Sequence, residues 1–409
     1  VQAHVMQGRP LARPDQARSE EFNLLQEKGL QILEWLTHNP ELDSFRNGLS
    51  GGYIPPGLGG DMFRSPQVMP SGRNLFQFDP RKVPSPVAMR RGAEVAENTL
   101  AEYRSRHGEW PRSVALILWG LETARTHGET VAQILTYLGL ELQRDQGFGD
   151  PRLEVVPLDQ LGRPRIDVTV QICGFFRDMF PNLLPLLAQA FELAGSLKES
   201  AEDNHIVKNA ALLKEELREQ GLEQEQINEL SLARIFGPAP GTYGTLVNDL
   251  VKSAHWQAEG DLVSAFLDSL QHAYTKNHYG SEQRDLLTKN LTRVDMVSQI
   301  RCSVDREITD LDHYYEYFGG LARTVEQYSG KRPTMLISDS TLGRVRTEDI
   351  SSAIGRGART RILNPKWIDG MLGHKHHGGT EIAERLENLI GLSATTHAVD
   401  NTIWDDVNR

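Results

Sequence analysis

Four side chains that could move protons or bind anions follow a short apolar segment, SVALILW at 113–119. The segment predicts a buried strand, because it is short, apolar and bounded by proline and glycine. Since α/β proteins bind ligands at the carboxyl ends of their strands, the positions after this strand are candidates for a site. Glutamates there could act as catalytic bases, and an arginine could bind an anionic substrate. The residues are Glu122, Arg125, His127 and Glu129.

These positions also have a structural interpretation. Thr126 or a neighbour could cap a helix over 127–138, and Glu129 would then lie in the first turn, where negative charge is stabilising. Both interpretations stay open at this point: Glu122 and Glu129 are catalytic candidates, and Arg125 is a substrate-binding candidate.

Two more arginines occupy comparable positions. Arg73 and Asn74 lie in the turn-rich stretch 51–86, and loops on a rigid scaffold often carry binding residues. Arg177 follows the apolar segment 166–173, so it too could face a ligand. The structural alternatives are that Asn74 holds a turn and Arg73 binds a carbonyl.

The sequence Asp312-His313-Tyr314-Tyr315 places a carboxylate, an imidazole and two aromatic rings together. It could form a proton relay, with His313 as a catalytic group, or a wall on which a flat ligand stacks, with Tyr314 as a binding residue. The alternative is the start of an amphipathic helix with Asp312 near its N-terminus.

A helix is expected to begin at Asn364-Pro365, with Asn364 as N-cap and Pro365 in the first helical position. Arg361 just before it and Lys366 just inside it are cationic and could contact an anionic substrate. We favour the structural interpretation for Asn364 and Pro365.

Histidines at 374, 376 and 377 resemble a set of metal ligands, since imidazole binds cobalt or zinc well. The neighbouring lysine and glycines favour an exposed turn instead, so no metal ligands are assigned. The only cysteines, Cys173 and Cys302, are too few for a disulfide framework or a cysteine-rich zinc site. Cys173 is expected to be buried, and a reducing, cytoplasmic location is expected.

Apolar periodicity predicts an α/β fold with parallel-sheet units and large helical segments. Asp178 is expected to cap a helix with Pro181 in its first turn. The expected strands are 113–119, 153–159, 166–173, 294–301 and 334–340. The other expected helices are 22–38, 87–107, 127–138, 347–358, 365–372 and 380–391.

The length of 409 residues predicts roughly two or three domains. We expect an N-terminal linker and helix, an α/β domain with a turn-rich entry loop, a helical region, and a second α/β region that becomes helical. The expected boundaries are 1–50, 51–200, 201–292 and 293–409.

Charge and missing motifs exclude several classes of function. The net charge of -11 argues against a general nucleic-acid binder, and no apolar run is long enough for a membrane span. The chain has no GxxxxGK[ST] segment for ATP, no GxGxxG after the strands of the first α/β stretch and no HExxH. Since it does not begin with methionine, it is expected to be part of a longer protein.

Eight segments in order resemble the large-subunit family of ATP-dependent cobalt and magnesium chelatases, the CobN type. They are GGYIPPGLGGD (51–61), PSGRNLFQFDP (70–80), LILWGLETARTHGETVAQILTYLGL (116–140), RPRIDVTVQICGFFRDMFPNLLPLL (163–187), ARIFGPAPGTYGTLVNDLV (233–251), TDLDHYYEYFGGLARTVE (309–326), RTRILNPKWIDGM (359–371) and SATTHAVDN (393–401). The resemblance implies roughly the last third of a subunit that binds a tetrapyrrole and works with separate AAA+ ATPase subunits. Metal and macrocycle are then substrates, ATP is used by the partners, and no cofactor is held permanently.

FGPAPGTYG and HYYEYFGG look closer to the cobalt branch, which implies insertion of cobalt into a hydrogenobyrinate-type corrin. The alternatives are insertion of magnesium into protoporphyrin IX, a tetrapyrrole carrier or sensor, and a structural part that docks the ATPases. Metal insertion needs His or carboxylate bases for the ring protons, and arginines suit peripheral carboxylates. The catalytic candidates are therefore Glu122, Glu129 and His313. The substrate-binding candidates are Arg73, Asn74, Arg125, Arg177, Tyr314, Arg361 and Lys366.

Overall fold

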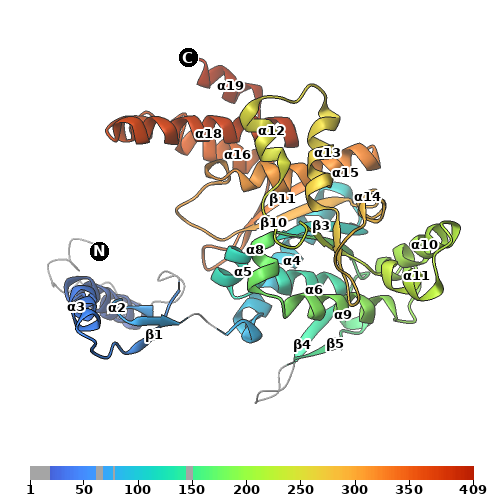
Figure 1. Cartoon of the computed structure of the whole chain (residues 1–409), viewed down its shortest axis with the longest axis horizontal. Helices are drawn as coiled ribbons and strands as arrows, with labels where there is room; N and C mark the ends of the chain where they lie inside the picture. The colour runs from blue at the N-terminus through green and yellow to red at the C-terminus, as the bar shows by residue number, and fades with distance from the viewer. Residues whose placement is uncertain (1–18, 61–67, 77–78, 144–150) are drawn as a thin grey trace. The chain divides into compact units, whose positions relative to one another are not determined.

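The computed structural model describes residues 19–60, 68–76, 79–143 and 151–409. It divides the chain into two compact units, Val1–Asp79 and Pro80–Arg409 (Figure 1). The first unit contains helices α2 (Ser19–Thr37) and α3 (Glu41–Leu49), and a parallel pair of short strands, β1 (Pro56–Leu58) and β2 (Asn74–Phe76). Gly72 has a φ of 81° and lies so close to the α3 N-terminus that a side chain there would clash with Glu41.

The second unit is built on an eight-stranded sheet in the order β12-β11-β10-β3-β6-β7-β8-β9. Neighbouring strands from β11 to β7 run parallel, whereas β12, β8 and β9 pair antiparallel. The parallel strands are β3 (Ser113–Leu118), β6 (Asp167–Ile172), β7 (Ile235–Gly237), β10 (Met296–Arg301) and β11 (Thr334–Asp339). The antiparallel strands are β8 (His272–Tyr274), β9 (Tyr279–Glu282) and β12 (Arg346–Asp349). The predicted α/β class is confirmed.

Helices cover both faces of this sheet, which explains why every residue of β3, β6 and β10 is buried. On one side α4 (Pro86–His107) packs against α6 (Glu129–Leu138), and α4 also contacts the sheet strands β10 to β12 (Figure 1). The other side carries a π-helix, η5 (Tyr314–Gly319), which continues as α15 (Gly320–Ser329) and packs on α18 (Lys375–Thr396).

The start and end of α4 follow directly from local sequence. The Ser85 side chain accepts a hydrogen bond from the Ala88 N–H at 3.1 Å, and Pro86 occupies the first helical position. The helix stops at Gly108, whose φ of 78° is left-handed. These signals explain why the predicted helix over 87–107 is confirmed nearly to the residue.

The predicted helix over 127–138 is confirmed with its start at Glu129, and a separate short helix, α5 (Gly120–Thr126), precedes it. His127 and Gly128 separate the two helices with φ angles of 58° and 98°. The Thr126 hydroxyl accepts hydrogen bonds from the N–H groups of Gly128 (3.2 Å) and Glu129 (3.0 Å). The N-cap residue of α6 is Gly128, and the hydroxyl of its neighbour Thr126 satisfies the first N–H groups, so the expectation that Thr126 or a neighbour caps this helix is confirmed.

Two predicted elements are wrong in detail. The segment expected as a sheet strand at 153–159 forms β5 (Arg152–Val155), which pairs antiparallel with β4 (Leu140–Gln143) in a separate hairpin. Its side chains alternate between exposed and half-buried, so it lacks the two covered faces of a central strand.

Asp178 does not cap a helix. It lies inside α8 (Gly174–Met179), whose N-cap is Cys173: its Sγ accepts a hydrogen bond from the Phe176 N–H at 3.3 Å. The next helix, α9 (Leu183–Gly195), begins only after Pro181. Asp178 instead pairs with its neighbour Arg177.

Strands from the expected regions 51–200, 201–292 and 293–409 all belong to the one large sheet. In particular, β10 of the last region pairs with β3 of the first. The two α/β stretches are thus halves of one layer, and the expected boundaries stay predictions. No helix within the described ranges is both long and apolar enough to cross a membrane.

Candidate functional site

The sheet changes its winding direction between β3 and β10. From β3 the parallel order continues to β6 and β7 on one side, whereas β10 continues to β11 on the other side. Adjacent parallel strands whose connections leave in opposite directions create a crevice at their carboxyl ends, where α/β proteins bind ligands. β3 and β10 pair over three residues only, ending at Ser298↔Leu116, which is short of the end of both strands. We call this place the β3–β10 crevice.

Trp119 lies directly after β3, at the mouth of the β3–β10 crevice. Its indole stacks on the imidazole of His313, with ring centroids 5.0 Å apart and an interplanar angle of 24°. Tyr317 meets the indole edge-on, at 4.7 Å. Tyr317 lies in η5 and His313 immediately precedes it, so this π-helix reaches over the end of β3.

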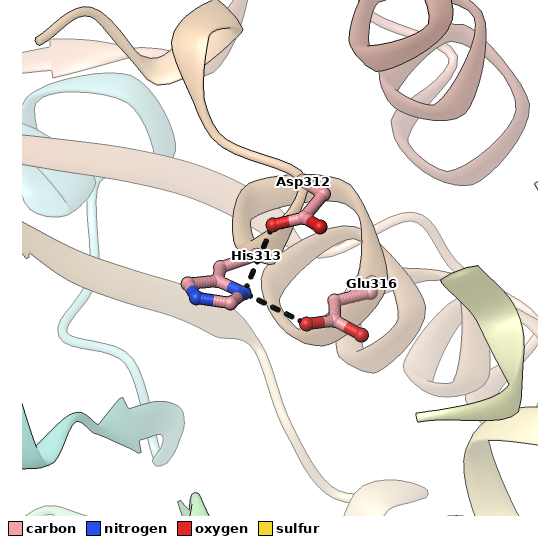
Figure 2. A group of neighbouring side chains, drawn as sticks. All are labelled: Asp312, His313 and Glu316. Carbon is pink, nitrogen blue, oxygen red and sulfur yellow. Dashed lines mark hydrogen bonds and ion pairs between the residues drawn. The ribbon is translucent and has the colours of Figure 1, made fainter. Parts of the chain in front are cut away.

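Asp312, His313 and Glu316 form a compact cluster at the start of η5, which we call the His313 cluster. The Nδ1 atom of His313 lies 2.8 Å from Glu316 Oε1 and 3.1 Å from Asp312 Oδ1. Figure 2 shows the imidazole extending from the helix, with one ring nitrogen between the two carboxylates and the other turned away from them. The His313 side chain is 50% exposed, whereas that of Glu316 is only 3% exposed.

Glu316 is fixed by a residue that follows β7. Its Oε2 accepts hydrogen bonds from the backbone N–H and the hydroxyl of Thr245, both at 3.2 Å. One carboxylate oxygen is thereby committed to Thr245 and the other to His313. A buried carboxylate with two fixed partners gives the imidazole a defined orientation.

Asp312 is fixed by α12 (Leu246–Ser253). Asn248 donates its amide to Asp312 Oδ2 at 3.3 Å, and Lys252 Nζ lies 3.9 Å from the same oxygen. The side-chain oxygen of Asn248, Oδ1, in turn accepts a hydrogen bond from the Tyr315 hydroxyl at 2.6 Å. Side chains far apart in sequence therefore hold both carboxylates of the cluster.

The electrostatics of the His313 cluster favour a protonated imidazole. Burial alone would lower the pKa of His313, but the hydrogen bond to Glu316 and the charge of Asp312 outweigh it, so the pKa lies above the ordinary histidine value. Among the His, Cys, Asp and Glu residues that the structure describes, these three are grouped closely enough to hold a metal ion. Their possible ligand atoms all lie within 4.8 Å of one another. The cluster can accept a proton or supply oxygen and nitrogen ligands to a divalent cation.

The catalytic candidates Glu122 and Glu129 lie inside the protein. Glu122 is 4% exposed and accepts a hydrogen bond from the Thr126 hydroxyl at 2.9 Å. Glu129 is 3% exposed, and its Oε1 lies 3.7 Å from Arg91 Nε. Both carboxylates hold the α5–α6 corner in this structure, and a catalytic role for them stays a prediction.

Arg125 and Tyr314 lie near the β3–β10 crevice in different ways. Arg125 comes from α5, after β3, and its Nη1 reaches Cys302 Sγ, after β10, at 3.9 Å. It therefore spans the crevice. Tyr314 is 7% exposed, and burial raises the pKa of its hydroxyl, so the ring is packed inside and does not offer a free stacking face. The aromatic ring that stacks on His313 is Trp119, not Tyr314.

Arg177 is 1% exposed and clamps the loop after β7. Its guanidinium binds both oxygens of Asp178, at 2.7 and 3.1 Å, and donates to the carbonyl of Ala239 at 2.6 Å. It also lies over the ring of Tyr243, 5.5 Å from the centroid. Arg177 follows a strand end, as the sequence predicted, but its guanidinium N–H groups donate to acceptors within the protein. Contact between Arg177 and a substrate stays a prediction.

The remaining candidates are scattered. Arg361 pairs with the buried carboxylate of Asp310 at 3.0 Å, and Lys366 is exposed in the first turn of α17 (Pro365–Leu372). The expected cap is confirmed, because Asn364 accepts a hydrogen bond from the Lys366 N–H at 3.1 Å. Arg73 is exposed and belongs to the first unit, as does Asn74, the first residue of β2.

The histidines at 374, 376 and 377 are exposed around the start of α18, and across the described ranges they do not form a group with metal-site geometry. Sequence reasoning missed Trp119, Glu316 and Thr245. The spacing of His313 and Glu316, three residues apart, was an available signal, because such pairs meet on one face of a helix. Thr245 had no such signal.

The fold and the cluster define an α/β protein with a histidine–carboxylate site at the switch point of its sheet. A family model described as CobN/Magnesium Chelatase matches residues 3–409, and the chain belongs to this family. The chain is 36% identical over 367 residues to an aerobic cobaltochelatase subunit CobN from a Sinorhizobium species, covering 88% of this chain and 28% of that protein. It is 33% identical over 385 residues to a magnesium-chelatase subunit from Chlorobaculum parvum, covering 93% of this chain and 30% of that protein.

A solved structure, the catalytic subunit of cobaltochelatase from Mycobacterium tuberculosis, is similar across 98% of this chain and 37% of that chain. Its TM-score is 0.84, at 30% sequence identity. The predicted resemblance is therefore confirmed. The chain spans about 30% of the length of the curated relatives it matches, and the two branches of the family are similarly close to it.

Proposed function

We propose that this chain is part of the tetrapyrrole-binding large subunit of a chelatase, and that the His313 cluster takes up a proton when metal enters the ring. The observation that supports the proposal is the position of the cluster: a half-exposed imidazole, backed by two carboxylates, lies at the β3–β10 crevice. Family membership supplies the substrate class, because relatives on both branches are named as cobalt or magnesium chelatases.

As a divalent metal ion enters, the macrocycle loses its inner N–H protons: two from a porphyrin, which then carries two negative charges, and one from a corrin, which then carries one. In the proposed step a pyrrole N–H bond breaks, its electron pair stays on the ring nitrogen to bind the metal, and the proton goes to Nε2 of His313. Nδ1–H, held by Glu316 and Asp312, leaves the Nε2 lone pair directed away from the carboxylates (Figure 2). The two carboxylates then stabilise the imidazolium that forms.

Trp119 and Arg125 would support this step by orienting the imidazole and by binding the macrocycle. Stacking on Trp119 holds the plane of the imidazole, so that Nε2 keeps one direction. Arg125 brings a positive charge to the same crevice, where a macrocycle with peripheral carboxylates is bound most favourably. Both residues act by binding and orientation, and neither exchanges a proton with the ring.

For the particular reaction we propose cobalt insertion into a hydrogenobyrinate-type corrin, driven by ATP hydrolysis on separate AAA+ subunits in the cytoplasm. The glycine- and proline-rich FGPAPGTYG and the HYYEYFGG segment support the cobalt branch. Insertion of magnesium into protoporphyrin IX is the second candidate, because a magnesium-chelatase relative is 33% identical, close to the 36% of the cobalt relative.

The test is metal insertion by the full-length subunit together with its ATPase partners. Cobalt with hydrogenobyrinate a,c-diamide and magnesium with protoporphyrin IX are compared in parallel, and ring binding is followed by fluorescence quenching. We expect insertion with the corrin pair, and His313→Ala is expected to slow insertion by about 100-fold or more while changing ring affinity little. Ring binding without insertion of either metal would identify a carrier, and a normal rate for His313→Ala would refute the role of the cluster.

A further inference from the structure

An arginine-rich cavity lies at the carboxyl ends of β10 and β11. It is open to solvent and has a volume of about 610 Å³, which is in the range of small-molecule sites. Four arginines line it: Arg301, Arg344, Arg346 and Arg356. We call it the arginine cavity.

The positive charges of the arginine cavity are only partly balanced. Arg301 binds Asp339 at 2.5 Å and Glu307 at 3.3 Å, and Arg356 binds Glu307 at 3.1 Å and also pairs with Glu348. Two arginines thus engage all three acidic residues that line the cavity.

The other two arginines keep their charges available. Arg344 and Arg346 are exposed, and neither makes a hydrogen bond or ion pair through its side chain in the described part of the chain. With four cations against three anions, the cavity has an excess of one positive charge. Its unsatisfied donors are two guanidinium groups, which bind carboxylates in a planar, two-pronged geometry.

The loop that carries Arg344 is held in place by side chains of α4. Arg91 of α4 donates to backbone carbonyls within 340–343 at 2.7 to 2.9 Å, and Glu94 accepts from the Val345 N–H at 3.0 Å. The Val345 side chain is buried against Val95. The free guanidiniums therefore project from a fixed backbone, which reduces the ordering cost of binding an anion.

The arginine cavity and the His313 cluster share one edge of the sheet. Arg301 and Asp339 end β10 and β11, and β10 lies next to β3, whose end carries Trp119. β11 is the second strand from β3, and two strand spacings amount to about 10 Å where the strands are paired. A ligand over the β3–β10 crevice can therefore extend toward the arginine cavity.

From this placement we propose that the arginine cavity binds a peripheral carboxylate of the macrocycle, with Arg344 and Arg346 as its ligands. The inference rests on the proposed function, because it takes the tetrapyrrole as the substrate class. It adds residues that hold the ring by its edge, separate from the group that exchanges protons with the ring.

The experiment measures binding of two macrocycles to the full-length subunit, each as free acid and as methyl ester: hydrogenobyrinate a,c-diamide and protoporphyrin IX. For whichever acid binds, Arg344→Ala and Arg346→Ala are each expected to weaken affinity by about tenfold, and the double variant by more. Affinity for the ester, which lacks the carboxylate charge, should be weaker in the native subunit and insensitive to both substitutions. Arg218→Ala, an equal loss of charge at an exposed position of α10 (His205–Glu219), is the control.

Unchanged affinity of the acid in the double variant would overturn the inference, as would equal losses for acid and ester, or no binding of either acid. The result is separable from that for His313. A subunit in which His313→Ala inserts metal normally, but in which Arg344→Ala weakens only the acid, would refute the proton role and retain the carboxylate subsite.

Discussion

The His313 cluster and the α5–α6 corner each place carboxylates close to the β3–β10 crevice, but only one of them exposes a titrating group. At the corner, Glu122 and Glu129 are both nearly inaccessible and are bound by Thr126 and Arg91. In the cluster, the carboxylates are the held groups and the imidazole is half-exposed. A site that exchanges protons with a ligand needs this division, with buried partners fixing an accessible base.

The largest expected effect separates these two sets of carboxylates. Glu316→Gln removes the charge that orients His313 and should slow metal insertion by about 10- to 100-fold, because outer partners of a catalytic imidazole have effects of this size. If the Glu122 carboxylate only holds the α5–α6 corner, Glu122→Gln leaves the insertion rate within about threefold and acts mainly on stability, whereas a larger loss would support its predicted catalytic role. The rates are measured with saturating macrocycle and metal, and ring affinity serves as the control. Equal losses in the two variants would remove the distinction.

Arg177 is interpreted as a structural residue, and this role can be tested by measuring the stability of a variant. Arg177→Ala removes the hydrogen bonds that this buried guanidinium donates to the carbonyl of Ala239 and to the carboxylate of Asp178, so we expect a loss of about 2 to 3 kcal/mol in the free energy of unfolding. Chemical denaturation measures this loss, with the exposed Arg218→Ala as the control. A native-like stability of Arg177→Ala would show that the loop after β7 does not depend on this clamp.

The pH dependence of insertion should identify the base. Because the pKa of His313 is raised, the neutral imidazole predominates only above a pH higher than the ordinary histidine value of about 6.5, so the insertion rate should rise with pH through a point above that value. Glu316→Gln removes an interaction that raises this pKa, and the rising limb should move to lower pH. A limb at the same pH in Glu316→Gln would indicate that another group accepts the proton.

The smallest effect concerns a residue assigned only to structure. Asn364→Ala removes the side chain that accepts the Lys366 N–H and should lower the free energy of unfolding by about 1 kcal/mol. Metal insertion per folded molecule should not change. A large loss of insertion rate without a loss of stability would show that Asn364 contributes to the functional site and not only to the fold.

Local signals made much of the fold predictable. The segment 113–119 is apolar and bounded by Pro111 and Gly120, and it forms β3 almost as expected. Asn364-Pro365 begins α17 as expected. In each case the deciding interactions lie within a few residues, so the sequence pattern contains them. The resemblance of eight segments likewise identified the family, because it depends on residue order and needs no contacts.

The failures have the opposite character. The segment 153–159 has a strand pattern, yet it pairs with a neighbour outside the sheet, because strand pairing is decided by partners that the segment does not contain. Arg177 was placed correctly at a strand end, but the direction of its guanidinium depends on carbonyls about 60 residues away.

By itself, the sequence determined the family, the α/β class, the strand ends that carry polar side chains, and the pairing of His313 with Asp312 in one segment. Tertiary structure alone decided that β10 lies beside β3, that Trp119 stacks on His313, and that Thr245 fixes Glu316 from 71 residues away. The physical reason is range: caps, turns and helix faces depend on neighbours in the chain, whereas burial and access depend on which distant segments the core brings together.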